Sequence, residues 1–164
     1  MNVVSAPALG SRFEAWLPAA DLETEPSVAD DTAATLGRGE TVMIVEPDRE
    51  LLLRHEDMLA ALGYEPVGFE HGTDALAASR AEPTRFDASV ISDDSAPSAC
   101  FLARKLHETA PQLPIILATA SAIEVGAETL ASAGVTELLR RPLTSAELAA
   151  ALARSLPSPA TLPT

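Results

Sequence analysis

Charged and hydroxyl side chains follow four apolar segments of this chain, at the point where each segment ends. The groups are Glu46, Pro47 and Asp48; Asp93, Asp94 and Ser95; Thr119, Ala120 and Ser121; and Arg140, Arg141 and Pro142. Together they contain carboxylates, hydroxyls and guanidinium groups. A carboxylate can attack phosphorus, hard oxygens can hold Mg²⁺, and a hydroxyl and a cation can bind phosphoryl oxygens. If these groups meet in space, phosphoryl chemistry is the chemistry they suit.

The elements that must position these groups alternate regularly between strand and helix. Strands are predicted at 42–45, 64–69, 86–92, 114–118 and 135–139, and helices at 52–62, 73–80, 99–109, 123–133 and after the cap residue Thr144. This fivefold alternation predicts the α/β class, with a doubly wound parallel sheet and helices on both faces. Pro66 favours an edge position for the second strand. Ligands of such sheets bind beyond the carboxyl ends of the strands, so the four groups should share one rim.

The rest of the chain differs in composition from this alternating region, which extends from 40 to 156. Residues 1–18 contain one predicted strand, in which Phe13, Ala15 and Leu17 alternate with other residues before Pro18. Residues 19–39 are acidic and lack periodicity, as is typical of a flexible linker. Residues 157–164 form a proline-rich tail.

Charge and composition exclude several classes of function. The net charge of −13 leaves no basic surface for nucleic acid or for an anionic membrane. Hydrophobic residues make up 47% of the chain and aromatic residues 4%, so we expect an aliphatic core. The chain has one cysteine, Cys100, which excludes an intramolecular disulfide and to which we assign no redox role. Neither a signal peptide nor an apolar run of membrane length is present, which favours the cytoplasm.

Four stretches in this order resemble receiver domains of two-component signalling: VMIVEPD, FDASVISDDSAP, PIILATA and LLRRPLTSAEL. The resemblance implies the flavodoxin-like (βα)5 fold of CheY-like domains, with strand order 2-1-3-4-5. It also implies that Asp93, rather than Asp94, accepts a phosphoryl group, because the spacing from Phe86-Asp87 and to Pro97 selects it. Thr119 then lies at the position of the switch hydroxyl, and the face formed by the fourth helix and fifth strand is expected to switch.

The same resemblance implies a Mg²⁺ site formed by Glu46, Asp93 and the backbone carbonyl of Ser95, with Asp48 as a further candidate ligand. Pro47 stands where the family has its second acidic residue, and proline has no side-chain ligand. Arg141 replaces the family's lysine, and a planar guanidinium is not equivalent to an ammonium group. We therefore expect a weakened metal site.

The N-terminal stretch SAPALGSRFEAWLP resembles the last segment of a histidine-kinase ATP-binding domain. The catalytic parts of a kinase are absent, so this chain is not expected to be an enzyme. The stretches VEPDRELL and ALGYEPVGF resemble receivers at the C-terminal end of VirA-like hybrid sensor kinases. The implied partner is a histidine kinase or phosphotransfer domain in the same parent polypeptide. The resemblance is compatible with membrane anchoring of that parent polypeptide. Homodimer formation stays open.

Two other functions compete with phosphotransfer. Pro47 and Arg141 favour a pseudo-receiver that docks on its kinase and regulates it without being phosphorylated. A nucleotide-binding flavodoxin-like enzyme is the third alternative, but no glycine-rich phosphate loop follows the first strand. The histidines lack the mutual spacing of a metal site, and His55 and His107 are predicted to be surface or boundary residues on helices.

Overall fold

The computed structural model describes residues 2–6, 10–14, 37–93, 95–120 and 126–156, and the chain divides into two units at Thr32 and Ala33. In the first unit, β1 (Asn2–Ala6) and β2 (Gly10–Glu14) form an antiparallel hairpin. The sequence predicted one strand here, ending at Pro18. The hairpin adds a strand that the prediction lacked, because the short segment before it carries no alternating pattern; residues 15–18 lie outside the described part.

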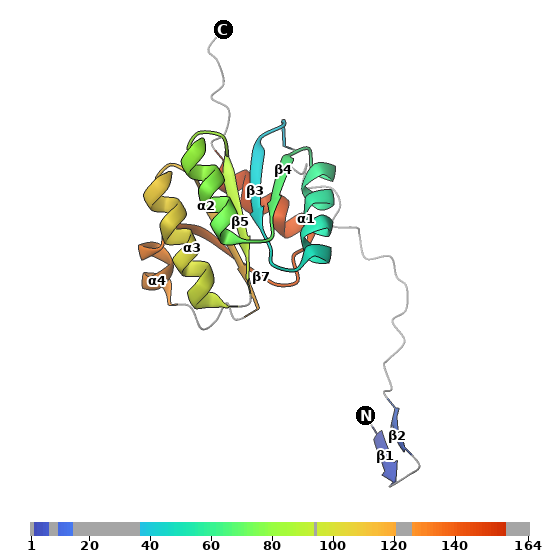
Figure 1. Ribbon diagram of the computed structural model, residues 1–164. Helices are drawn as coiled ribbons and strands as arrows, with labels where there is room; N and C mark the ends of the chain where they lie inside the picture. Colours follow the sequence, from blue (N-terminus) through green and yellow to red (C-terminus); the bar gives the residue numbers. More distant parts are fainter. Residues whose placement is uncertain (1, 7–9, 15–36, 94, 121–125, 157–164) are drawn as a thin grey trace. The chain divides into compact units, whose positions relative to one another are not determined.

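The second unit contains a five-stranded parallel sheet in the order β4-β3-β5-β6-β7 (Figure 1). Its strands are β3 (Thr41–Val45), β4 (Glu65–Phe69), β5 (Ala88–Ser92), β6 (Ile115–Thr119) and β7 (Val135–Arg140). Its helices are α1 (Arg49–Ala61), α2 (Gly72–Ala81), α3 (Ala96–Thr109), α4 (Ala127–Ser132) and α5 (Ser145–Ser155). This is the predicted doubly wound fold with strand order 2-1-3-4-5. Pro66 lies on the edge strand β4, as expected.

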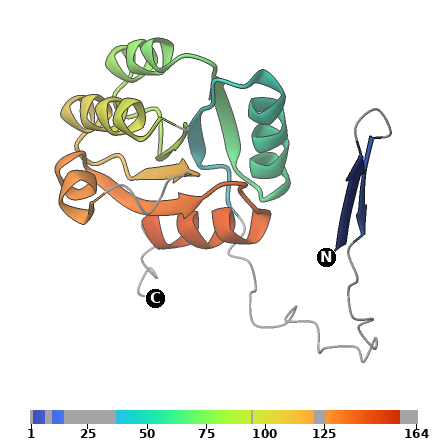
Figure 2. The same ribbon diagram turned by 90° about the horizontal axis from the view of Figure 1, so that it is seen from below.

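Two aliphatic cores cover the two faces of this sheet. Helices α2, α3 and α4 pack on one face, where Met43, Ile91 and Leu117 point into the core. Helices α1 and α5 pack on the other, against Ile44 and Ile116 (Figure 2). Adjacent residues of a strand point to opposite faces, so a strand covered on both sides is apolar throughout. The continuous apolar runs of the sequence have this cause.

Several helix ends follow local sequence signals. Gly63 and Gly134 follow α1 and α4 with φ of 87° and 73°, a conformation that favours glycine. Thr144 caps α5 by accepting a hydrogen bond from the Glu147 N–H. The sequence placed the start of α4 at 123, and residues 123–125 lie outside the described part of the chain. The described helix follows Gly126, a non-helical cap residue with ψ of 143°. Glycine has a low helix propensity, which suits this cap position.

Part of the predicted linker contacts the parallel-sheet unit. The N–H of Gly37 donates a hydrogen bond to the Leu62 carbonyl (2.8 Å), and the N–H of Gly39 donates one to the Gly63 carbonyl (2.9 Å). A side chain at Gly37 would meet the ring of Tyr64, because a Cβ there would lie 2.5 Å from it. The rest of the linker, 19–36, lies outside the described residues. Within the described part of the chain, no helix has the length and apolar character needed to cross a membrane.

Candidate functional site

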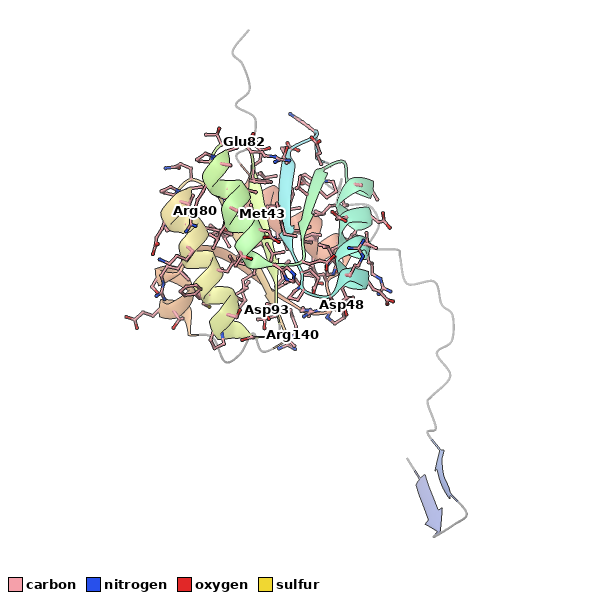
Figure 3. The ribbon with its side chains drawn as sticks, in the orientation of Figure 1. Met43, Asp48, Arg80, Glu82, Asp93 and Arg140 are labelled. Carbon is pink, nitrogen blue, oxygen red and sulfur yellow. The ribbon has the colours of Figure 1, made fainter. Side chains whose placement is uncertain are left out.

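The carboxyl ends of β3, β5, β6 and β7 bring the predicted site residues to one rim. The Asp93 N–H donates to the Ala118 carbonyl (3.2 Å), and the Arg141 N–H donates to the Thr119 carbonyl (3.3 Å). These bonds join the ends of β5, β6 and β7. Figure 3 labels Asp48, Asp93 and Arg140 at this edge of the unit, with Glu82 at the opposite edge. The rim that the sequence predicted is therefore present.

Glu46, the first residue after β3, is almost fully buried, with 1% of its surface exposed. Its Oε2 accepts a hydrogen bond from the Ser92 hydroxyl (2.6 Å), and its Oε1 accepts one from the Asp48 N–H (3.1 Å). Nη2 of Arg141 lies 3.3 Å from Oε2. A buried carboxylate requires such partners, because it has lost its contact with water. Glu46 is thus held by two hydrogen bonds and one ion pair.

Arg141 reaches this carboxylate from the end of β7. Its side chain retains 15% of its exposure, whereas the neighbouring Arg140 is exposed to solvent. The Arg141–Pro142 peptide bond is cis. The resemblance placed Arg141 at the position of the family's lysine, as a cation that could bind phosphoryl oxygens. In the structure its guanidinium forms an ion pair with Glu46, and this partner was not anticipated from the sequence.

Asp93 lies half-buried at the mouth of an open pocket of about 250 Å³, which Pro47, Asp48 and Arg141 also line. Its Oδ1 accepts a hydrogen bond from the Ser95 N–H (2.8 Å). A second open pocket of about 370 Å³ also reaches Asp93, on its α2 side. The carboxylate is therefore accessible from outside while one of its oxygens is fixed by the backbone.

Thr119, the last residue of β6, is buried beside the strand that leads to Asp93. Thr119 lies one strand from the candidate acceptor Asp93, and its role as a switch hydroxyl stays a prediction. Ser92, which precedes Asp93, is also buried and donates to Glu46. Ser92 was not predicted as a site residue. A polar residue at the end of a buried strand, directly before the acidic pair, was the signal available for it.

The four predicted donors to Mg²⁺ already accept hydrogen bonds from the protein. Besides Glu46 and Asp93, Oδ1 of Asp48 caps α1 by accepting from two backbone N–H groups, those of Glu50 and Leu51. The Ser95 carbonyl accepts from the Ala99 N–H (3.0 Å). Among the residues that the structure describes, no group of three or more His, Cys, Asp or Glu side chains is placed to hold a metal ion. The arrangement does not fit a divalent cation.

His55 belongs to the same buried cluster, contrary to the prediction that it lies near the surface. Its Nδ1 lies 3.9 Å from Glu46 Oε2 and has no hydrogen-bond partner. Burial lowers the pKa of His55 below its ordinary value; nearby Glu46 opposes this shift, and Arg141 adds to it. Leu52, His55 and Leu59 share the buried face of α1. Their helical spacing was a readable signal that the prediction for His55 neglected.

Comparison with known proteins identifies the fold. No protein-family model matches the chain. A response regulator receiver domain protein from Clostridium thermocellum superposes with a TM-score of 0.64 at 18% identity, over 71% of this chain and 93% of that one. A response regulator from Thermotoga maritima gives 0.62 at 19% identity, over 73% and 99%. A CheY-like receiver domain protein from Methanospirillum hungatei gives 0.61 at 20%, over 71% and 92%.

These structures and the strand order define the parallel-sheet unit as a CheY-like receiver fold. At this level of identity the likeness concerns the fold alone. What the unit does must be argued from its own residues at the rim of the sheet.

Proposed function

We propose that this protein acts in two-component signalling as a receiver domain, with Asp93 as the phosphoryl acceptor. The observation that carries the proposal is the accessible carboxylate of Asp93 at the end of β5, with the buried hydroxyl residue Thr119 at the end of the adjacent strand. Asp93 follows the carboxyl end of β5 and Thr119 ends β6, and parallel sheets bind ligands beyond such strand ends. Asp94 has no described position, so the choice of Asp93 rests on the sequence spacing and on this accessible carboxylate.

In the proposed reaction, a carboxylate oxygen of Asp93 attacks the phosphorus of a partner's phosphohistidine. The new O–P bond forms as the N–P bond breaks, and the imidazole nitrogen leaves with the electron pair. The product is an acyl phosphate on Asp93 and an unphosphorylated histidine. Thr119 would donate a hydrogen bond to a phosphoryl oxygen, and Arg141 would offer it a positive charge. The proposed output is a change in the face formed by α4 and β7.

The partner in this proposal is a histidine kinase or phosphotransfer domain, most simply one in the same parent polypeptide. The hairpin of β1 and β2 supports a hybrid arrangement, because its residues 5–6 and 10–14 belong to the stretch that resembles the end of a kinase ATP-binding domain. The site would work in the cytoplasm, where phosphohistidine donors are made. Self-association through the α4 and β7 face is a further part of the proposal.

Treatment with a small acyl phosphate such as acetyl phosphate tests the acceptor without an identified partner. Intact-mass spectrometry should show one added phosphoryl group on the full chain and on Asp57→Asn, which alters an exposed carboxylate on α1. Asp93→Asn should show none. Equal phosphorylation of Asp93→Asn would overturn the assignment, and so would a failure of the unaltered chain to take up phosphate from both acetyl phosphate and a phosphorylated kinase.

The occupied donors at the rim favour a second candidate, a pseudo-receiver that docks on its kinase without phosphorylation. Glu46 is committed to Arg141 and Ser92, and Pro47 provides no ligand. Under this candidate, Asp93→Asn changes neither binding to the kinase portion of the parent protein nor its autophosphorylation rate. Loss of regulation in Asp93→Asn, with binding retained, would exclude the docking-only function.

A further inference from the structure

The carboxylate of Glu46 has a counter-charge supplied by the protein itself. Glu46 is 1% exposed, and Nη2 of Arg141 lies 3.3 Å from its Oε2. An ionised carboxylate removed from water is stable only when it is paired and hydrogen-bonded. Arg141 supplies the charge, and the Ser92 hydroxyl and Asp48 N–H supply the hydrogen bonds. No additional cation is needed to balance this buried group.

A divalent ion would have to displace existing interactions to bind here. Mg²⁺ requires oxygen ligands at about 2.0–2.1 Å in near-octahedral geometry. At Glu46 it would share a carboxylate with a guanidinium already 3.3 Å from one oxygen, and two positive charges at that range repel each other. Asp48 caps α1, and the Ser95 carbonyl accepts the first hydrogen bond of α3.

Pro47 removes the remaining opportunity for a metal ligand at this rim. It lines the same pocket as Asp93 and Arg141, at the position directly after Glu46. An acidic side chain there would add a ligand and a negative charge on the open side of the pocket. Proline adds neither, so the carboxylates that line the pocket are those of Glu46, Asp48 and Asp93, and Arg141 is already paired with Glu46.

We infer that the Arg141 guanidinium takes the place of a divalent cation in this pocket, so that the domain does not bind Mg²⁺ at millimolar concentrations. The inference rests on the proposed function, because that function identifies the pocket as the acceptor site. The experiment that tests the inference measures Mg²⁺ binding and not phosphorylation. Arg141 is then a resident positive charge whose position is fixed by Glu46. The acceptor pocket would have a permanent charge balance, independent of the free Mg²⁺ concentration.

Amide NMR of the full chain during a MgCl₂ titration tests this inference. The unaltered protein and Arg140→Ala, a matched control that removes the exposed neighbouring arginine, should show no saturable shifts at Asp93 or Ser95. The double variant Pro47→Asp/Arg141→Met restores an acidic ligand and removes the resident cation. Its Mg²⁺ affinity should rise by roughly tenfold or more over the unaltered protein, with shifts centred on these amides.

Saturable shifts at Asp93 and Ser95 in the unaltered protein at millimolar Mg²⁺ would overturn the inference. A folded double variant that still fails to bind would also overturn it, because Arg141 and Pro47 would then not be what excludes the ion. If the double variant unfolds, Pro47→Asp, which keeps Arg141 paired with Glu46, provides the second test. It should still show no saturable shifts at Asp93 or Ser95 at millimolar Mg²⁺, and saturable shifts would contradict the role of the cation. A negative phosphorylation result for Asp93 leaves these metal titrations unchanged, so the two failures are distinguishable.

Discussion

Two Glu–Arg pairs in this unit differ in geometry and in surroundings. Arg154 on α5 binds Glu137 on β7 through two contacts, Nε to Oε1 at 2.8 Å and Nη2 to Oε2 at 3.3 Å. Arg141 approaches Glu46 with Nη2 at 3.3 Å from Oε2. The Arg154 and Glu137 side chains retain 56% and 26% of their exposure, against 15% and 2% for Arg141 and Glu46. The pair with the closer contacts is the exposed one.

This difference teaches that contact distance alone does not rank ion pairs. Water and salt screen an exposed pair, and its loss leaves two solvated charges. Loss of one partner from a buried pair leaves a charge that water cannot reach. We therefore expect the Glu46–Arg141 pair to contribute more to the free energy of unfolding and to determine the chemistry of the rim. We expect the Glu137–Arg154 pair to contribute little to either.

The largest expected effect comes from Arg141→Met. Removing this guanidinium leaves Glu46 buried without its counter-charge, which should lower the free energy of unfolding by about 3–5 kcal/mol. The matched variant is Arg154→Met, which removes an exposed arginine and should have a much smaller effect. Urea denaturation followed by circular dichroism measures both. Equal losses of unfolding free energy in the two variants would show that burial does not make the Glu46–Arg141 pair more important for stability than the exposed pair.

Ser92→Ala removes the hydroxyl that donates to Glu46 Oε2 at 2.6 Å. Because the acceptor is a buried charged group, we expect a loss of about 1–3 kcal/mol in the free energy of unfolding. Ser98→Ala, on the exposed surface of α3, is the control and should be nearly neutral. If Ser92→Ala is as neutral as Ser98→Ala, the hydroxyl does not support the buried carboxylate.

The pH dependence of stability should also distinguish the buried His55 from an exposed histidine. Burial lowers the pKa of His55 from its ordinary 6.5, so the unfolded chain binds this proton more readily than the folded chain. Stability is then complete above pH 6.5 and falls as the pH drops below that value toward the folded pKa. His55→Asn should lose this part of the pH dependence in urea titrations. The exposed His71→Asn control should retain it, and a curve for His55→Asn identical to that of the control would contradict burial as the cause.

The smallest effect is expected at the exposed pair. The hydrogen bond from Arg154 lowers the pKa of Glu137 below its ordinary 4.5. Its contribution is therefore present above that value and is lost as the pH falls below it. Glu137→Gln should reduce stability slightly at neutral pH and low salt, and added salt should remove the difference from the unaltered protein. A difference that persists in molar salt would show that the pair is not screened as its exposure requires.

Much of the fold could be predicted because it follows from local patterns. Apolar runs such as 42–45 and 114–118 appear as strands covered on both faces, and Pro66 correctly indicated the edge strand. The predicted helix ends at 62 and 133 are each followed in the structure by a glycine with positive φ, Gly63 and Gly134. Gly126 caps the described helix α4, and the alanine-rich pattern around it did not indicate this boundary.

The residues that lie at the rim could be predicted, but the contacts between their side chains could not. Strand ends placed Glu46, Asp93, Thr119 and Arg141 together, since parallel strands end at one edge. Which carboxylate Arg141 would contact depends on side-chain reach across β3 and β7, and these strands are not neighbours in the sheet. This pairing is a tertiary fact that no local pattern contains. The burial of His55, by contrast, could have been predicted from its helical spacing with Leu52 and Leu59.

The central claim, that Arg141 is a resident cation of the rim, is tested most directly by side-chain ¹⁵N NMR of the arginines. The account predicts that the Arg141 guanidinium protons exchange slowly with water and keep their shifts at millimolar Mg²⁺, while those of Arg154 exchange rapidly. Equally rapid exchange of the two side chains, or a saturable Mg²⁺-dependent shift of Arg141, would contradict it.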